Sequence, residues 1–194
     1  LFAAALALFF LIGNNYDQCG AGTRLAERNF FGAIRVVEDK VTDAMTLFHG
    51  RTLHGWQSRR PELAREPTSY YARKGPIGDF FNARPPAARV GVVGLGAGTL
   101  AAYARKGEQW DFFEINPIVV AVARNPAFFT YLRDAAVTPR VLVGDARLEL
   151  GHVPDASYDL LVLDAFGSDS IPVHLLTREA FALYWRKLRP GGRI

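Results

Sequence analysis

The sequence contains little of what several specialised folds require. A single cysteine, Cys19, among 194 residues excludes a framework of disulfide bonds and a cysteine-ligated metal cluster. The four histidines show neither an i, i+4 pair nor the H-E-x-x-H spacing of zinc enzymes, so we predict no metal. The net charge is +4, but the arginines are scattered and no basic stripe with interleaved aromatic residues is present. We therefore predict no nucleic-acid partner.

The longest wholly apolar run is also short. It covers residues 1–12 (LFAAALALFFLI), whereas a helix needs about 20 residues to cross a bilayer. No basic segment precedes it, as one would in a signal peptide. Because the chain opens without Met, we interpret this run as the end of a transmembrane helix, with a buried helix of a soluble fold as the alternative. Arg24 and Arg28 follow soon after, which is the pattern of a cytoplasmic exit.

Residues 13–28 are predicted to be a linker, and residues 29–57 a small β domain. The β domain is rich in β-branched and aromatic side chains and contains a glycine-bearing turn. Its expected strands cover residues 30–38, 44–48 and 52–57. Since so small a sheet is marginal alone, it should pack on a larger neighbour. Residues 58–86 are a proline-marked connecting segment with a short helix over 77–81.

The motif around which the chain is organised follows an apolar strand at 89–93. Three glycines come at alternate positions, Gly94, Gly96 and Gly98. Such a turn uses backbone angles that a Cβ forbids, and a helix starting there points free N–H groups at a ligand. The dinucleotide fingerprint is G-x-G-x-x-G, but here Thr99 occupies the third glycine position. The spacing favours S-adenosylmethionine-binding folds over NAD-binding ones, and a tight turn without a ligand is the alternative.

Strand-like and helix-like segments alternate over the rest of residues 87–194. Strands are expected over residues 109–115, 140–144 and 158–165. Helices are expected over residues 116–125 and 177–188, with a helical turn over 128–133. This alternation predicts an α/β fold with a doubly wound, mostly parallel sheet, which binds ligands beyond the carboxyl ends of its strands. The chain stops after RPGGR, where another strand should begin, so we expect a C-terminally truncated fragment of a longer protein.

Acidic residues end three of the predicted strands. Glu114 follows Gly94 by 20 positions, where a carboxylate accepts both ribose hydroxyls of an adenosine. Asp145 either accepts from the adenine amine or caps the next short helix, and Ala146 beside it is a further cofactor-binding candidate. Asp164 ends an apolar strand, so desolvation should raise its pKa and suit it to proton transfer. A turn or cap role is the alternative for Asp164.

Two further groups are candidates for the substrate site. Asp169 lies in the loop that follows Asp164, where a solvated loop acid is the alternative. Tyr70 and Tyr71 form a pair in the connecting segment. They either line a pocket beside the cofactor domain or pack in a core.

Several blocks together resemble the spermidine synthase-like (polyamine aminopropyltransferase) family. They are VVGLGAGTLAAYARKG, FFEINPIVVAVA, VGDAR and YDLLVLDAFGSDSIPVHLLT, preceded by the hairpins FFGAIRVVED and MTLFHGRTLHGWQ. The resemblance runs from about residue 29 to the end. It is closest to the branch in which transmembrane helices precede the synthase-like domain. It implies a Rossmann fold like that of S-adenosylmethionine methyltransferases, membrane attachment and a cytoplasmic catalytic domain.

The resemblance also implies a role for each candidate. The glycine loop would hold the nucleoside, Glu114 the ribose and Asp145 the adenine, while Asp164 would be the catalytic carboxylate. Gln57 and Tyr70 would lie in the amine pocket. The implied reaction is attack by an amine on the carbon next to the sulfonium of decarboxylated S-adenosylmethionine, which transfers an aminopropyl group. The implied partners are a small polyamine-like amine and a second copy of the chain.

The sequence departs from the family at three positions. Ala97 stands where the family's glycine loop carries Asp, and Ala72 stands where it carries Glu after the pocket tyrosine. Asp164 and Asp169 are five positions apart rather than the family's three. Two alternatives therefore stay open: an S-adenosylmethionine-dependent methyltransferase on the same fold, and a non-catalytic nucleoside-binding domain of a membrane protein.

Overall fold

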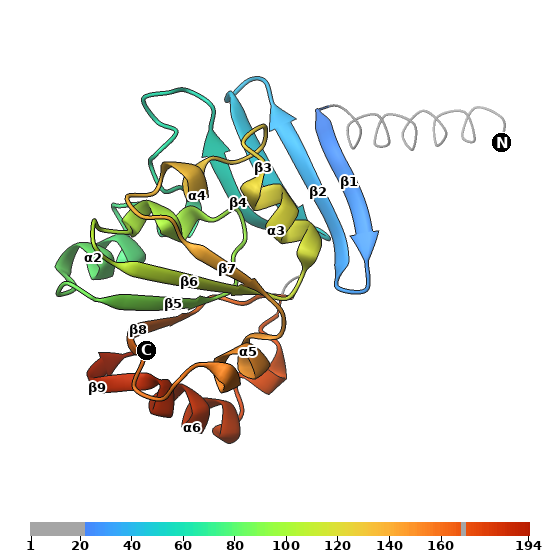
Figure 1. Cartoon of the computed structure of the whole chain (residues 1–194). Helices are drawn as coiled ribbons and strands as arrows, with labels where there is room; N and C mark the ends of the chain where they lie inside the picture. Colours follow the sequence, from blue (N-terminus) through green and yellow to red (C-terminus); the bar gives the residue numbers. More distant parts are fainter. Residues whose placement is uncertain (1–21, 168–169) are drawn as a thin grey trace, which may run out of the picture.

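The computed structural model describes residues 22–167 and 170–194. They form a four-stranded antiparallel sheet beside a five-stranded parallel sheet (Figure 1). The predicted transmembrane segment, residues 1–12, and the linker up to residue 21 lie outside the described residues. Among the described residues, none of the helices combines the length and the apolar character that crossing a membrane requires.

The antiparallel sheet has the order β1-β2-β3-β4. Its strands are β1 (Thr23–Asn29), β2 (Gly32–Asp39), β3 (Ala44–His49) and β4 (Thr52–Ser58). The last three were predicted, but residues 23–28 were assigned to the linker and instead form most of β1. This edge strand pairs only with β2 and keeps most of its side chains at least partly exposed, so it lacks the apolar alternation that reveals a strand.

One face of the antiparallel sheet is buried against the parallel sheet. Ile34 and Val36 on β2, with Met45 and Leu47 on β3, belong to the same apolar cluster as Val92 of the parallel sheet. These side chains alternate along their strands with more exposed ones. The small β domain therefore shares one core with its larger neighbour, as its size requires.

The parallel sheet has the order β7-β6-β5-β8-β9, and all its pairs are parallel. Its strands are β5 (Arg89–Val93), β6 (Gln109–Glu114), β7 (Arg140–Val143), β8 (Tyr158–Leu163) and β9 (Leu188–Arg193). The predicted α/β fold with a parallel sheet is confirmed. The chain runs outward from β5 to β7 on one side and from β8 to β9 on the other, so the order reverses between β5 and β8.

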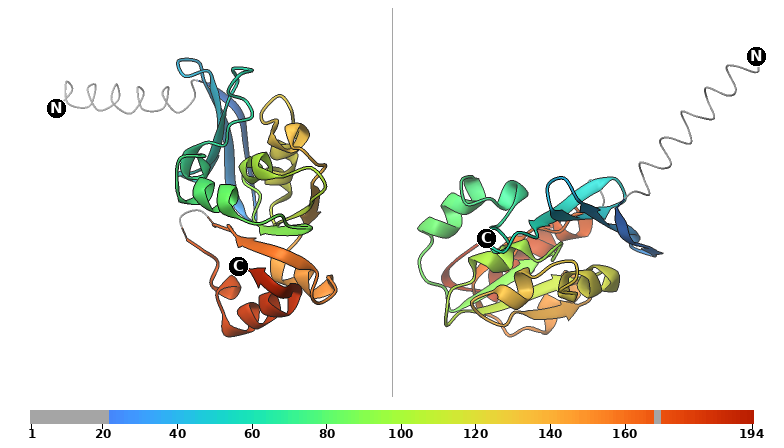
Figure 2. Two further views of the ribbon diagram at one scale, coloured as in Figure 1. Left: turned by 90° about the vertical axis from the view of Figure 1, so that its left-hand side faces the viewer. Right: turned by 90° about the horizontal axis from the view of Figure 1, so that it is seen from above.

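Helices cover both faces of this sheet. They are α2 (Pro76–Ala83), α3 (Pro117–Arg124), α4 (Tyr131–Asp134), α5 (Ala146–His152) and α6 (Arg178–Lys187). Figures 1 and 2 show α5 and α6 on one side, and α3, α4 and the antiparallel sheet on the other. The two sides correspond to two apolar clusters, one including Val92 and Val120 and the other including Val93 and Tyr184.

Two local predictions fail in instructive ways. The glycine loop is followed by a five-residue 3-10 helix, η2 (Thr99–Tyr103), rather than by an α-helix. Strand β9 already occupies residues 188–193, where the sequence Arg-Pro-Gly-Gly-Arg was read as the approach to a later strand. The proline and two glycines of β9 do not form a recognisable strand pattern. A sheet tolerates such residues mainly at its edge strands, and β9 is one of them.

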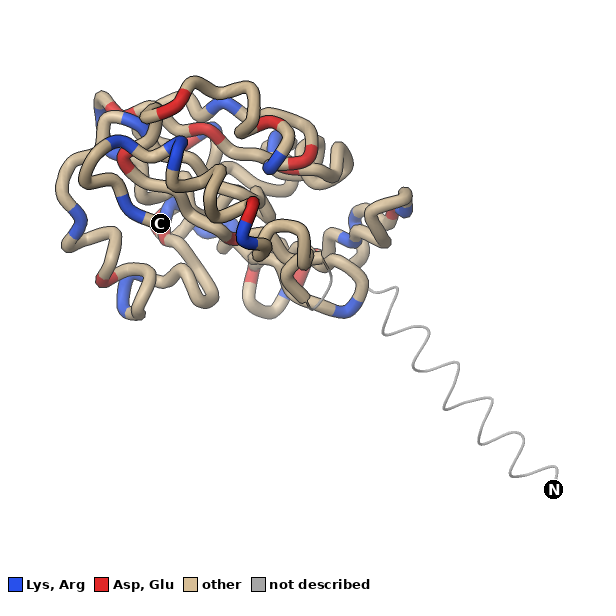
Figure 3. The backbone as a smooth tube through the Cα atoms, turned by 90° about the horizontal axis from the view of Figure 1, so that it is seen from below, with Lys and Arg blue, Asp and Glu red and all other residues tan. Residues whose placement is uncertain are grey.

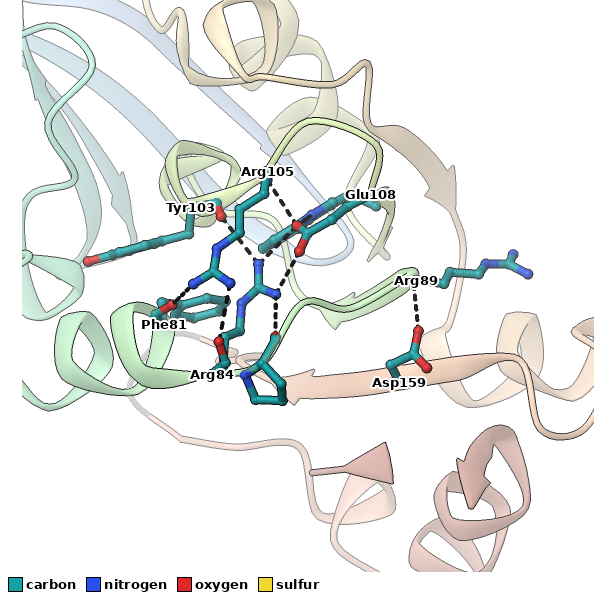
Figure 4. Close-up of polar contacts among 9 residues, drawn as sticks. Phe81, Arg84, Arg89, Tyr103, Arg105, Glu108 and Asp159 are labelled. Atoms are coloured by element: carbon teal, nitrogen blue, oxygen red, sulfur yellow. Dashed lines mark hydrogen bonds and ion pairs between the residues drawn. The ribbon is translucent and has the colours of Figure 1, made fainter. Parts of the chain in front are cut away.

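A buried ion pair fixes the opposite end of the parallel sheet (Figure 4). Arg84, just after α2, donates 2.7 and 2.9 Å hydrogen bonds to the two carboxylate oxygens of Glu108. Trp110 Nε1 and the backbone N–H of Arg105 donate to the same carboxylate, each at 2.9 Å. These bonds lower the pKa of Glu108 against the opposing effect of its burial. The network lies at the start of β6 and ties α2 to the sheet.

Candidate active site

A cavity of about 320 Å³ opens at the carboxyl ends of β5, β6 and β8. Its walls come from the glycine loop, from the segments that follow β6 and β8, and from the start of α5. The turn between β1 and β2 and the ends of β3 and β4 close the other side. This is the place where a doubly wound sheet binds its ligand, at the reversal of strand order.

The glycine loop is enclosed by the protein on both sides. Gly94 has φ 101°, and a Cβ there would overlap the backbone carbonyl of Asp164. Gly96 has φ 54°, and its Cβ would lie 2.8 Å from the carbonyl oxygen of His54 on β4. Both residues line the cavity, whereas Gly98 lies behind it, with Leu132 as its neighbour. Side chains are therefore excluded from Gly94 and Gly96 by neighbouring backbone, whether or not a ligand is bound.

Glu114 is held at the cavity wall by backbone donors. The N–H of Leu95 donates to one carboxylate oxygen at 3.1 Å, and the N–H of Asn116 donates to the other at 2.9 Å. Burial raises the pKa of Glu114, and these hydrogen bonds oppose the rise. The carboxylate thus has a fixed orientation beside the glycine loop, and its ribose-binding role stays a prediction.

The two carboxylate oxygens of Asp145 have different partners. Oδ1 accepts from the N–H groups of Arg147, at 2.9 Å, and Leu148, at 3.1 Å, and so caps α5. Oδ2 lies 2.9 Å from Nε2 of His174, which also lines the cavity. The cap role weighed from the sequence is therefore present, and the other oxygen contacts His174. Ala146 lines the cavity next to it.

Asp164 is joined to the predicted tyrosine pair. The Tyr71 hydroxyl donates to Oδ2 of Asp164, and the hydroxyl oxygens of Tyr70 and Tyr71 are 2.7 Å apart. Burial raises the pKa of Asp164 to about 6, although the bond from Tyr71 opposes the rise. The raised pKa predicted for Asp164 is confirmed. All three residues line the cavity, so Tyr70 and Tyr71 are wall residues, and Tyr71 is buried as well.

Gln57 is not at the cavity. Its amide nitrogen donates to the carbonyl of Ala64 at 2.6 Å and to the Thr130 hydroxyl at 3.0 Å, and its oxygen accepts from Thr130 N–H at 2.7 Å. The side chain is buried with both polar atoms occupied. It therefore joins β4 to the segment before α4 instead of facing an amine. Asp169 lies outside the described residues.

No sequence motif marks the cavity wall that the antiparallel sheet contributes. Phe31, His49 and His54 line the cavity from this side. His49 Nε2 lies 2.7 Å from the carbonyl oxygen of Phe31, and Asn29 donates a 2.8 Å hydrogen bond to Asn116 of the parallel domain. His174 was also missed as a partner of Asp145. These residues are brought together by hairpin and domain packing, for which the sequence carries no fixed spacing.

The charges at this site are of one sign. The cavity walls include three carboxylates, of Glu114, Asp145 and Asp164, and no Lys or Arg among the described residues. Elsewhere on the chain, basic and acidic residues are interspersed (Figure 3). Within the described residues, no cluster of three or more His, Cys, Asp and Glu has a metal-binding arrangement. The cavity is therefore suited to a ligand that carries positive charge.

The sequence is similar to that of a curated enzyme. A polyamine aminopropyltransferase from Vibrio vulnificus (strain CMCP6) is 32% identical over 114 residues, which cover 56% of this chain and 36% of the relative. The chain thus matches little more than a third of that relative's length. No family model matches the chain.

Solved structures resemble the chain over most of its length. The match to a spermidine synthase from Thermotoga maritima covers 86% of this chain and 54% of the synthase chain, with a TM-score of 0.61 and 12% sequence identity. The match to a probable spermidine synthase from Corynebacterium glutamicum ATCC 13032 covers 89% of this chain and 61% of that protein's chain, with a TM-score of 0.67 and 23% sequence identity. The chain has the spermidine synthase fold. The resemblance to spermidine synthases predicted from the sequence blocks is confirmed.

Proposed function

We propose that this chain is part of an enzyme that transfers the aminopropyl group of decarboxylated S-adenosylmethionine to an amine. The observation that carries the proposal is the cavity wall with three carboxylates and no Lys or Arg among the described residues. The decarboxylated donor carries an ammonium and a sulfonium and no carboxylate, so both of its charges suit such walls. Intact S-adenosylmethionine adds a carboxylate, which calls for a cation or free N–H groups.

The wall residues divide into two groups under this proposal. The glycine loop and Glu114 hold the nucleoside, and Oδ2 of Asp145, which contacts His174 in this structure, accepts a hydrogen bond from the adenine amine. Asp164 accepts a proton from the acceptor ammonium, and its pKa of about 6 makes it a stronger base than an ordinary Asp while leaving it ionised at neutral pH. The freed amine attacks the carbon next to sulfur. The C–N bond forms, the C–S bond breaks, and sulfur keeps the electron pair as methylthioadenosine leaves.

The reaction itself provides the test. The full-length protein is incubated with decarboxylated S-adenosylmethionine and putrescine, and methylthioadenosine and the aminopropylated amine are quantified by chromatography. We expect both products in equal amounts. The Asp164→Asn variant should lose at least roughly a hundredfold in rate, which is the low end of what a general base contributes. Equal rates for the two proteins would refute the role of Asp164, and no product from the wild type would refute the proposal.

Three further parts of the proposal concern membrane attachment, the acceptor substrate and the oligomeric state. Residues 1–12 attach it to a membrane, with the catalytic domain in the cytoplasm, and the support is their apolar run followed by Arg24 and Arg28. The acceptor is a small polyamine-like amine, and the enzyme works as a homodimer. Fractionation of cells with and without residues 1–12 tests the attachment. Sedimentation of the detergent-solubilised protein tests the dimer.

A further inference from the structure

A chain of hydroxyl groups leads from Asp164 to the protein surface. Asp164 accepts a hydrogen bond from Tyr71, whose side chain is buried. The Tyr71 oxygen is 2.7 Å from that of Tyr70, and either atom can donate. Tyr70, also a wall residue of the cavity, is 48% exposed, so the chain ends at a residue that solvent reaches.

The backbone fixes the positions of the two tyrosine side chains relative to each other. They belong to a single 3-10 turn, η1 (Ser69–Tyr71), in which Ser69 has a φ of 60°. Non-glycine residues rarely adopt positive φ, and such conformations persist where the surroundings enforce them. Here the Tyr103 hydroxyl donates to the carbonyl of Tyr71, and the N–H of Tyr71 donates to Thr68 at 3.2 Å. The rings of Tyr70 and Tyr71 lie 4.1 Å apart, centre to centre.

We propose that Tyr71 and Tyr70 form a proton relay between Asp164 and solvent. Its use in turnover rests on the proposed function, whereas the relay itself does not. In that reaction an ammonium acceptor becomes a secondary ammonium product, so one proton remains on Asp164 after each transfer. Protonated Asp164 donates to the Tyr71 oxygen, and the Tyr71 hydroxyl turns from Asp164 toward Tyr70. Tyr71 then passes its own proton to Tyr70, and Tyr70 releases one to water. Each phenol ends as it began, and the carboxylate is restored.

The surroundings keep both phenols neutral. Burial and the neighbouring Asp164 carboxylate raise the pKa of Tyr71 well above its ordinary value, and the same two causes raise that of Tyr70. A neutral hydroxyl both donates and accepts, which a concerted relay requires. The other titratable groups of the same cavity are carboxylates and imidazoles from other elements. They are His49, His54, Glu114, Asp145 and His174.

The test measures proton exchange at Asp164 without any substrate. In full-length protein with ¹³C-labelled Asp, relaxation dispersion of the Asp164 carboxyl carbon near its pKa reports how fast the proton enters and leaves. Tyr70→Phe keeps the Tyr71–Asp164 bond but cuts the link to solvent, so we expect exchange to slow by roughly tenfold or more. Tyr71→Phe should slow it similarly and also raise the pKa of Asp164, because the bond that favours the carboxylate is lost.

A matched control removes the same kind of bond elsewhere. The buried Tyr158 hydroxyl donates to the Asp111 carboxylate at 2.9 Å, away from the cavity walls. Tyr158→Phe should leave exchange at Asp164 unchanged. Unchanged exchange in Tyr70→Phe would overturn the relay, and so would equal slowing in Tyr158→Phe.

The transfer assay separates the relay from the proposed function. If the wild type transfers aminopropyl groups, Tyr70→Phe should slow turnover at low buffer concentration, and added imidazole should restore it. Rates of Tyr70→Phe equal to those of the wild type would show that turnover does not use the relay. If the wild type transfers nothing while Tyr70→Phe still slows proton exchange, the proposed reaction is refuted and the relay stands.

Discussion

Asp164→Asn should make the protein more stable at neutral pH, although it removes the proposed base. The pKa of Asp164 in the folded protein is about 6, against an ordinary value of 3.8. The difference is roughly 2 units, and at 1.36 kcal/mol per unit it corresponds to about 3 kcal/mol. Because the folded state holds the proton more tightly than the unfolded state, this acid opposes folding once both states are ionised.

The pH dependence gives this prediction its sign. Well below pH 3.8 Asp164 is protonated in both states and does not oppose folding, and its destabilising effect grows as pH rises through the window between 3.8 and about 6. Asn carries no charge and keeps an acceptor for the Tyr71 hydroxyl. Urea unfolding should therefore show a gain of about 1–3 kcal/mol for Asp164→Asn at pH 7, shrinking to nearly zero in acid.

Asp111 provides the control with the opposite sign. It also accepts from a tyrosine, but Arg89 and Arg140 pair with its carboxylate at 2.7 and 2.6 Å. Hydrogen bonds from Arg140, Arg89 and Tyr158 hold its pKa below the ordinary value despite its burial. Asp111→Asn should thus destabilise the protein at neutral pH and less so in acid. A loss of stability at pH 7 for Asp164→Asn, or an effect independent of pH, would refute the reasoning.

Three further predictions use the same assays. Gly96→Ala places a Cβ 2.8 Å from the His54 carbonyl oxygen, so methylthioadenosine binding measured by calorimetry should weaken at least roughly tenfold. Gly151→Ala, with open space around it and no positive φ, should not change that binding. Arg84→Met leaves the Glu108 carboxylate buried without its partner and should cost about 3–5 kcal/mol in urea unfolding, with much of the loss recovered by adding Glu108→Gln. Gln57→Ala should cost about 1–3 kcal/mol of stability by leaving Thr130 unpaired, and a raised KM for the amine at unchanged stability would contradict the structure.

The parallel sheet and its carboxylates could be predicted because their signals are local. The apolar run at β5, its glycines, and acids at the ends of β6 and β8 each follow from residue order and strand geometry. Glu114 and Asp164 line the same cavity because the carboxyl ends of parallel strands lie at the same edge of a sheet. The pKa of Asp164 rises for the reason that the sequence suggested, which is desolvation after a buried strand.

What could not be predicted depends on packing between distant segments. The resemblance implied a place for Gln57 in the amine pocket, but its side chain bonds to Thr130, 73 residues away, a contact that no local pattern in the sequence indicates. The link between Asp145 and His174 likewise joins α5 to a later turn. β1 (TRLAERN) and β9 (LRPGGR) were missed or misread because they contain too few apolar residues to show a strand pattern.

The central claim is that the cavity binds a nucleoside sulfonium whose tail is purely cationic. Calorimetry on the full-length protein should compare decarboxylated S-adenosylmethionine, intact S-adenosylmethionine and methylthioadenosine. The account predicts the tightest binding for the decarboxylated form, with a margin over the intact form that shrinks as salt rises. Tighter binding of intact S-adenosylmethionine would contradict it and indicate a methyltransferase, and no binding of any of the three would leave the glycine loop as a structural turn.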